Sequence, residues 1–193
     1  MAQTPSTMLE LGTAMPSFSL VDAVTGKAVS STNARGAKGT LVMFICNHCP
    51  FVQHVVPELG RIAREYGGRG MGIVAINSND LENFPQDGPE HMKSLAIAEG
   101  WKFPFLMDES QDVAKAYRAA CTPDFFLFDA AGSLVYRGRL DETRPKTEQV
   151  AHGRDLRAAL DAVVAGRKPD AEQQPSIGCN IKWKVGNAPV QLG

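Results

Sequence analysis

Two cysteines, separated by two residues, stand in the segment Cys46-Asn47-His48-Cys49-Pro50. Thiols at this spacing can cycle between a dithiol and a disulfide. If a helix begins directly after them, its first turn stabilises a thiolate, because that turn carries unpaired N–H groups and a partial positive charge. The cysteine pKa then falls below its free value of roughly 8.5. The segment therefore predicts thiol–disulfide chemistry that uses a redox-active disulfide and no separate cofactor.

The cysteine pair lies where an apolar strand is expected to meet an amphipathic helix. Residues 40–45 are nearly all apolar, which is typical of a strand buried on both faces. Residues 50–66 repeat apolar side chains with a helical period, and Pro50 suits the first turn, where its missing N–H costs nothing. Residues 70–77 read as a second buried strand. This order predicts a right-handed parallel βαβ unit with the cysteines at its first junction.

Further segments complete an alternating α/β pattern. We expect short strands and hairpins at 18–30, 103–108 and 124–138, a loop at 78–89, and helices at 90–100, 111–119 and 153–165. The order predicts a mixed sheet flanked by helices. Residues 1–16 are expected to be a loose lead-in, and residues 170–193 have no clear period. We therefore expect one domain over 1–169, with an N-terminal extension at 1–39, and a tail at 170–193 packed on the core.

The overall composition is that of an ordinary globular protein. The chain has 193 residues, of which 44% are hydrophobic and 21% charged, and its net charge is −1. A nucleic-acid binder usually carries a strong basic excess, so we expect no nucleic-acid partner. No apolar run has the length of a membrane span, and residues 1–10 lack the basic and apolar regions of a signal peptide. We therefore expect a cytoplasmic protein without a membrane partner.

Two further cysteines, Cys121 and Cys179, leave two interpretations open. Each is either an additional redox thiol or a small buried side chain that serves packing alone. A structural zinc ion needs four tetrahedral ligands, usually from a second closely spaced pair. The remaining donors are widely scattered, namely Cys121, Cys179, His48 and His54. We therefore expect no metal site.

Several segments together resemble the thioredoxin-like superfamily. The closest resemblance is to the branch that contains the thiol peroxidases and the membrane-anchored cytochrome-maturation thioredoxins (the AhpC/TSA and TlpA/ResA types). It spans residues 14–165 and rests on Met15-Pro16-Ser17-Phe18, Cys46-Asn47-His48-Cys49-Pro50, Phe103-Pro104-Phe105 and Thr122-Pro123-Asp124-Phe125. The tail, with Ser176-Ile177-Gly178-Cys179-Asn180-Ile181-Lys182-Trp183-Lys184, resembles that of an uncharacterised bacterial subgroup. The resemblance implies a three-layer thioredoxin-like fold with an N-terminal β-hairpin extension.

The resemblance also implies roles for the residues of the motif. Cys46 would be the exposed nucleophile, and Cys49 would resolve the mixed disulfide. Pro123 would be cis and pack beside the pair, so that a substrate peptide could add alongside Thr122 as a strand. His48 would stabilise the Cys46 thiolate. The implied activity is that of a thiol–disulfide oxidoreductase that acts on protein or small-molecule thiols and disulfides and serves cell redox homeostasis.

Two other functions stay open at this point. A thiol peroxidase with antioxidant activity would have a cysteine–proline step, a threonine three residues earlier and a downstream arginine. Cys49-Pro50 matches the first feature, but Cys46 replaces the threonine, and Thr122-Pro123 occupies the region of the arginine. The third function is a non-catalytic thioredoxin-fold binding module. Ile45 replaces the usual tryptophan and Thr40 stands near the usual buried acid, which argues against a general reductase.

Overall fold

The computed structural model describes residues 3–190 and contains a seven-stranded mixed sheet. Its strand order is β3-β2-β6-β5-β4-β8-β9. Strands β4, β5 and β6 run parallel, and the remaining pairs are antiparallel. The strands are β2 Ser19–Asp22, β3 Ala28–Ser30, β4 Gly39–Phe44, β5 Met71–Asn77, β6 Phe105–Met107, β8 Asp124–Asp129 and β9 Leu134–Gly138. The expected hairpin near residues 18–30 is thus an edge of this sheet, joined to it through β6.

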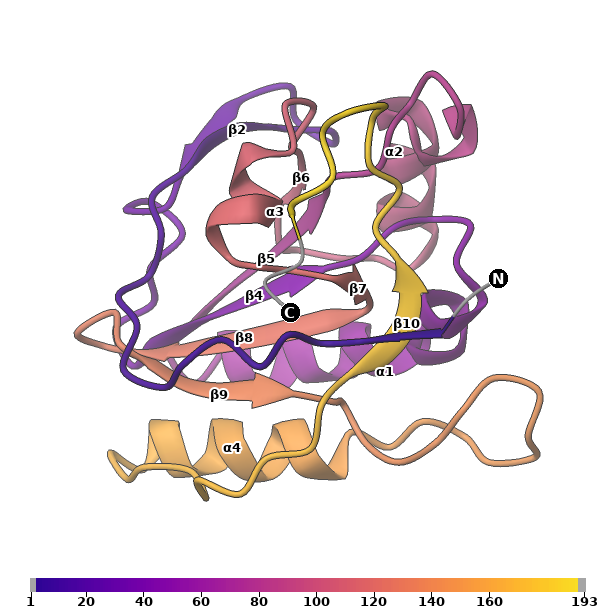
Figure 1. The fold of residues 1–193 in the computed structure, drawn as a ribbon. Helices are drawn as coiled ribbons and strands as arrows, with labels where there is room; N and C mark the ends of the chain where they lie inside the picture. Colours follow the sequence, from indigo (N-terminus) through magenta and orange to yellow (C-terminus); the bar gives the residue numbers. More distant parts are fainter. Residues whose placement is uncertain (1–2, 191–193) are drawn as a thin grey trace.

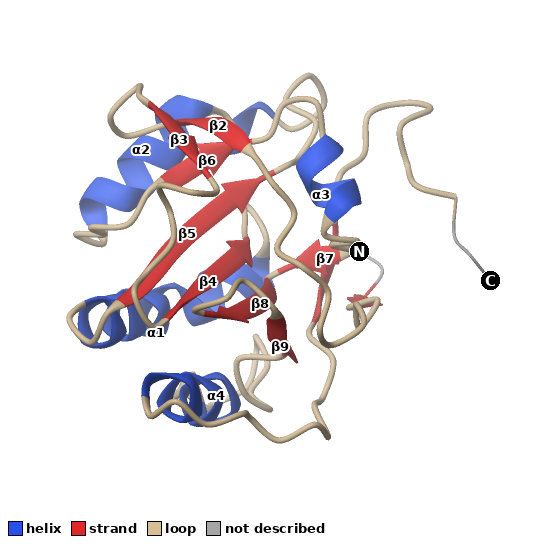
Figure 2. Ribbon diagram, turned by 90° about the vertical axis from the view of Figure 1, so that its left-hand side faces the viewer, coloured by secondary structure: helices blue, strands red, loops and turns tan. Residues whose placement is uncertain are grey.

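Helices pack on both faces of the sheet (Figure 2). The helices are α1 Pro50–Gly67, α2 Pro89–Ala98, α3 Asp112–Ala116 and α4 Arg154–Val164. Residues of α1, α2 and α4 share one apolar core with Leu41 and Met43, whereas α3 joins a second core with Val42 and Phe44. Successive side chains of β4 point to opposite faces of the sheet, so this strand contributes residues to both cores. The expected βαβ unit and mixed sheet flanked by helices are confirmed.

A second, three-stranded sheet joins the two ends of the described chain. It has the order β1-β10-β7, with β1 Gln3–Pro5, β10 Ile177–Asn180 and β7 Cys121–Thr122, all antiparallel. Figure 1 shows β10 running beside the N-terminal segment. The expectation of a loose lead-in over residues 1–16 was therefore wrong at β1, and the tail contains a strand. Both strands are too short for a sequence pattern to reveal, since each becomes stable only when its partner is present.

The segment between β5 and α2 is more ordered than the expected loop at 78–89. It contains a short 3₁₀ turn, η1, at Pro85–Asp87, and α2 begins directly after it at Pro89. The tail is bonded to the same region, because Lys182 N donates to Asn79 Oδ1 at 2.9 Å and Asp80 N donates to Lys182 O at 2.8 Å. These contacts bring the tail over the end of the sheet that carries the cysteine pair.

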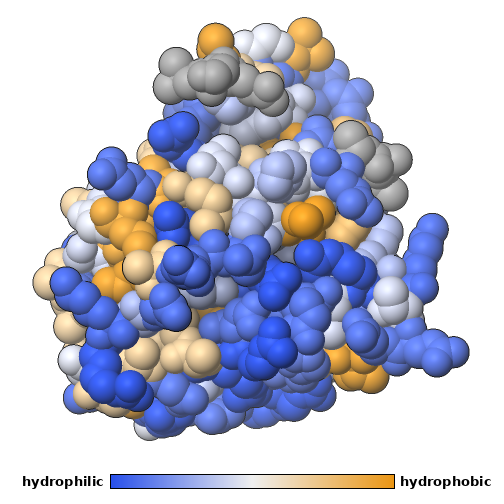
Figure 3. Space-filling model, turned by 60° about the horizontal axis from the view of Figure 1, so that its bottom comes forward, coloured by the Kyte–Doolittle hydropathy of each residue, from blue (hydrophilic) through white to orange (hydrophobic). Residues whose placement is uncertain are grey.

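The surface is largely polar. Hydrophilic residues cover most of the face shown in Figure 3. Large apolar side chains that are exposed lie apart from one another in the sequence, as with Val21, Ile97 and Val150. Among the described residues, no helix combines the length and apolar character needed to cross a membrane.

Candidate active site

The cysteine pair lies at the end of β4, where the chain turns into α1. Ile45 extends the strand through a backbone hydrogen bond to β5, and the next four residues form the turn. Cys49 is the N-cap residue of α1, with φ −71° and ψ 122°, and Pro50 begins the helix. Both cysteines are buried, with Cys46 1% and Cys49 0% exposed. The expected position of the pair at a strand–helix junction is confirmed.

Thr122 contacts both sulfurs. The peptide bond between Thr122 and Pro123 is cis, as the resemblance implied. Thr122 Oγ1 lies 3.4 Å from Cys46 Sγ, and Cys49 Sγ lies 3.2 Å from Thr122 O, to which it donates a hydrogen bond when it is protonated. The residue before the cis proline therefore holds the two sulfurs side by side.

One proton is shared unequally between the two sulfurs. The Cys46 thiol donates a hydrogen bond to Cys49, which lowers the pKa of Cys49 to about 5, helped by Cys179 and the Val52 N–H. The same hydrogen bond, together with burial and the charge of Asp87, raises the pKa of Cys46 well above its ordinary value. The first negative charge of the pair therefore resides on Cys49, at the helix N-terminus. This differs from the expectation that His48 lowers the pKa of Cys46.

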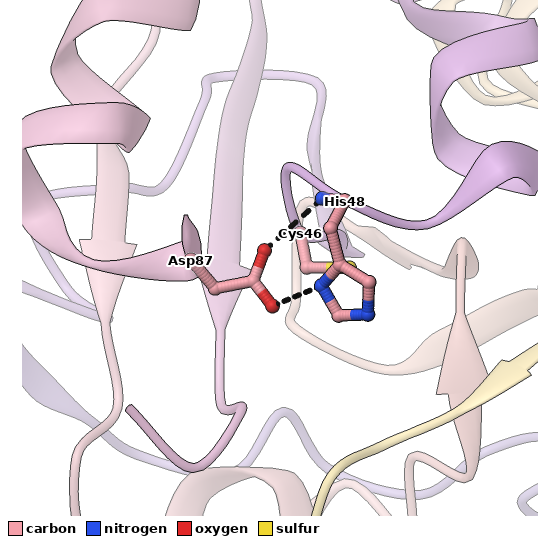
Figure 4. A group of neighbouring side chains, drawn as sticks. All are labelled: Cys46, His48 and Asp87. Atoms are coloured by element: carbon pink, nitrogen blue, oxygen red, sulfur yellow. Dashed lines mark hydrogen bonds and ion pairs between the residues drawn. The ribbon is translucent and has the colours of Figure 1, made fainter. Parts of the chain in front are cut away.

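His48 is held by a buried carboxylate that sequence analysis did not predict. Asp87, which is 0% exposed, accepts a hydrogen bond at Oδ2 from His48 Nδ1 at 2.5 Å. Its Oδ1 accepts the backbone N–H groups of Asn47 at 2.8 Å and His48 at 3.1 Å, and Asn79 Nδ2 donates to Oδ2 at 2.8 Å. Figure 4 shows the imidazole fixed against Asp87 and lying beside Cys46. The carboxylate thus orients the ring and shapes the turn that carries Cys46.

The site is covered, contrary to the expectation of an exposed first cysteine. The His48 ring stacks on Phe84 with centroids 5.4 Å apart, and Lys182 Nζ lies 5.6 Å from the centre of the Phe84 ring. Because Cys46 is only 1% exposed, a substrate disulfide reaches its sulfur only when this cover moves.

Three side chains offer donor atoms of a kind that metals bind. Donor atoms of Cys46, His48 and Asp87 lie within 4.8 Å of one another. Both oxygens of Asp87 already accept hydrogen bonds, from the backbone of the turn and from Asn79. A metal would have to displace these bonds and find a fourth ligand, so the arrangement suits an oriented histidine better than a zinc ion.

The other two cysteines lie near the pair but differ in their contacts. Cys121 is buried, and its pKa is raised by burial and by the neighbouring charge of Asp124. Cys179 is 2% exposed and lies opposite Thr122 in the pairing of β10 with β7. Burial and a hydrogen bond with Cys49 raise the pKa of Cys179 to about 12. Of the two, Cys179 is the one in hydrogen-bond contact with the redox pair.

No acid stands at the position where the resemblance places a buried one. Thr40 occupies it, its hydroxyl accepts a hydrogen bond from Gly36 N, and it lies at the opposite end of β4 from Cys46. Asp124, directly after the cis proline, is fully buried, and burial raises its pKa to about 7. Asn79 could have been found from sequence, because it follows β5 at the same sheet edge as the cysteines. Asp87 carries no such signal, since it reaches the site from the middle of a connection.

Solved structures place the fold in the thioredoxin-like class. The thioredoxin domain of a thiol-disulfide oxidoreductase from Bacteroides vulgatus superimposes with a TM-score of 0.57 at 21% identity, covering 70% of this chain and 90% of that chain. An uncharacterized conserved protein from Geobacillus kaustophilus is much more similar, with a TM-score of 0.93 and 50% identity over 95% of this chain and 97% of that chain. The expected thioredoxin-like fold is confirmed.

The chain belongs to the Redoxin family, whose model matches residues 10–152. The thiol-disulfide oxidoreductase ResA of Halalkalibacterium halodurans is 26% identical over 110 residues, which is 57% of this chain and 58% of that protein. The match therefore spans less than two thirds of this relative. The expected resemblance to the ResA type is confirmed, whereas the assignment of the tail to a bacterial subgroup stays a prediction.

Proposed function

We propose that this protein is a thiol–disulfide oxidoreductase that exchanges disulfides through Cys46 and Cys49. The observation that carries the proposal is the pair of hydrogen-bonded sulfurs held against Thr122 at the N-terminus of α1. The hydrogen bond from Cys46 lowers the pKa of Cys49, which favours a thiolate within the pair. Similarity to proteins named thiol-disulfide oxidoreductase supports the same activity.

The proposed reaction begins with a proton transfer inside the pair. The Cys46 proton passes to Cys49 along their hydrogen bond, and the Cys46 thiolate attacks a substrate disulfide. One substrate sulfur then leaves as a thiolate, and the other remains in a mixed disulfide with Cys46. Cys49 gives its proton to the leaving sulfur and attacks Cys46, which releases the second substrate thiolate. Two electrons pass from the dithiol to the substrate, and a Cys46–Cys49 disulfide remains.

In this proposal Asp87 positions the His48 ring, and the ring takes part in proton transfer. The carboxylate fixes the ring beside Cys46, so the imidazole can exchange a proton with that sulfur or with a leaving thiol. Protein or small-molecule disulfides, and in the reverse direction dithiols, are the substrates that this chemistry fits. The reaction as written needs no further cofactor.

Redox equilibration tests the proposal. The reduced protein is incubated in glutathione buffers with an increasing fraction of oxidised glutathione. It is then quenched with acid, its free thiols are alkylated, and its peptides are identified by mass spectrometry. We expect a reversible Cys46–Cys49 disulfide that is lost in Cys46→Ser. The Cys49→Ser variant should retain substrates covalently on Cys46, because the resolving thiol is missing. A protein whose two cysteines never form a reversible disulfide would show the proposal to be wrong.

A peroxidase with antioxidant activity has one feature in its favour, the thiolate at Cys49 directly before Pro50. Two features argue against a peroxidase. Cys49 is 0% exposed, and Cys46 replaces the expected threonine. We therefore expect hydrogen peroxide to be consumed no faster than by free cysteine. Consumption well above that rate, abolished in Cys49→Ser, would favour the peroxidase.

A further inference from the structure

The tail strand β10 occupies the edge of β7 beside the cis proline. Cys179 pairs with Thr122, and Asn180 pairs with Cys121, in antiparallel register. The two backbones approach closely at Gly178, where an added Cβ would lie 2.0 Å from Thr122 O. This is the edge at which a substrate peptide would add as a strand. The chain's own tail therefore takes the place of a substrate strand.

The register of β10 directs one cysteine toward the redox pair. Cys179 is 2% exposed and belongs to the same apolar core as Cys46 and Cys49, whereas the next residue, Asn180, is exposed. Its pairing partner Thr122 is the residue that contacts both sulfurs. Cys179 itself is hydrogen bonded to Cys49. Three sulfurs thus meet, with Cys49 between the other two.

We infer that Cys179 is a third redox thiol, which attacks the Cys46–Cys49 disulfide at Cys49 and moves the disulfide onto the tail strand. The inference rests on the proposed function, because that reaction supplies the starting disulfide. In the step, the Cys179 thiolate forms a bond to Cys49 Sγ while the Cys46–Cys49 bond breaks. Cys46 leaves as a thiolate and takes up the proton that Cys179 lost. The number of disulfides is unchanged, so no other oxidant or reductant is required.

Oxidation of the pair prepares Cys179 for this step. In the reduced protein burial, the hydrogen bond with Cys49 and the negative charge on Cys49 all raise the pKa of Cys179. The two influences of Cys49 vanish when Cys49 enters a disulfide, whereas burial still raises the pKa of Cys179 and the positive charge of Lys182 still lowers it. Cys179 therefore becomes more acidic when the Cys46–Cys49 disulfide forms.

The Cys46→Ser variant isolates the second sulfur pair. It is treated under native conditions with oxidised glutathione, which first forms a mixed disulfide on Cys49, and the disulfides are mapped by peptide mass after acid quenching. We expect a Cys49–Cys179 disulfide with release of glutathione. The matched control Cys46→Ser/Cys121→Ala should form it equally, because Cys121 makes no hydrogen bond to the pair. Cys46→Ser/Cys179→Ala should lose it and retain glutathione.

Disulfide mapping of the oxidised wild-type protein distinguishes the proposed function from the proposed role of Cys179. Both disulfides, Cys46–Cys49 and Cys49–Cys179, should be present and interconvert. A wild-type protein with the first disulfide alone, together with no Cys49–Cys179 disulfide in Cys46→Ser, overturns the inference and leaves the proposed function intact. A wild-type protein that forms no Cys46–Cys49 disulfide overturns the proposed function, and the exchange step with it.

Discussion

At the scale of single residues, the redox pair contains two sulfurs that differ in how tightly each holds a proton. Cys49 caps α1 and receives hydrogen bonds, whereas Cys46 faces the carboxylate of Asp87. The N-terminus of α1 therefore lowers the pKa of Cys49, whereas the carboxylate of Asp87 raises the pKa of Cys46. The hydrogen bond from Cys46 to Cys49 is the largest influence on both pKa values, and burial and the charge of Asp87 raise the pKa of Cys46 further.

The ultraviolet absorbance of thiolates, measured in the reduced protein as the pH is raised, should show the difference in pKa between Cys46 and Cys49. We expect an ultraviolet step near pH 5 that disappears in Cys49→Ser. In Cys46→Ala the step should move to higher pH, because a hydrogen-bond donor to the thiolate is lost. Since folding lowers the pKa of Cys49, its contribution to stability should be present above the unfolded pKa of about 8.5 and lost as the pH falls through about 5. A titration with no step below pH 7 would contradict this assignment.

At the scale of elements, the short strand β10 connects the tail to the redox site. Its contact with β7 depends on Gly178, because any side chain there would collide with the carbonyl of Thr122. The strand is also bonded on its other side to β1. The strand beside the redox site is therefore held between β7 and the N-terminal strand β1.

The Gly178→Ala variant should displace β10 from β7. The added methyl group would overlap Thr122 O, and overpacking of this kind costs on the order of 1–3 kcal/mol. We expect faster alkylation of Cys46 and Cys49 by iodoacetamide in the native protein. Gly67→Ala is the matched control, since an added Cβ there meets nothing within 4 Å. Equal alkylation rates in the two variants would argue against β10 as a cover.

Sequence patterns predicted the elements whose signals are local. Residues 40–45 and 70–77 are nearly free of polar side chains because their strands are buried on both faces, and they appear as β4 and β5. The strand β10 escaped prediction because Gly178 and Asn180 break any alternation, and its pairing is set by distant residues. Asp87 was missed for the same reason, since a loop of nine residues separates it from Asn77 and gives no sign of turning back.

At the scale of the whole molecule, α1 and α4 are joined through a buried carboxylate. Glu58 of α1 is 2% exposed and accepts hydrogen bonds from Arg61 at 2.5 Å and from Arg157 of α4 at 2.7 Å. The helix that carries the redox pair is thereby tied to the last helix of the chain. A buried charge needs its partners, so the junction is sensitive to the loss of either arginine.

Removal of the interhelical partner should destabilise the protein. In Arg157→Met, Glu58 keeps only the half-exposed Arg61, and we expect a loss of about 3 kcal/mol in the free energy of unfolding, measured with urea. The double variant Glu58→Gln/Arg157→Met should recover part of the loss. Arg154→Ala, which removes exposed ion pairs from the same helix, should change stability by less than about 1 kcal/mol. Similar losses of stability in Arg157→Met and Arg154→Ala would contradict the view that buried Glu58 depends on Arg157.

The pairing of β1 with β10 has a consequence for the order of events during synthesis. A chain emerges from the ribosome N-terminal end first, so residues 3–5 and both cysteines of the motif are made long before residues 177–180. Until then β1 has no neighbour, and the edge of β7 stays open. Of the contacts around the redox pair, the pairing of Cys179 with Thr122 is therefore the last to form.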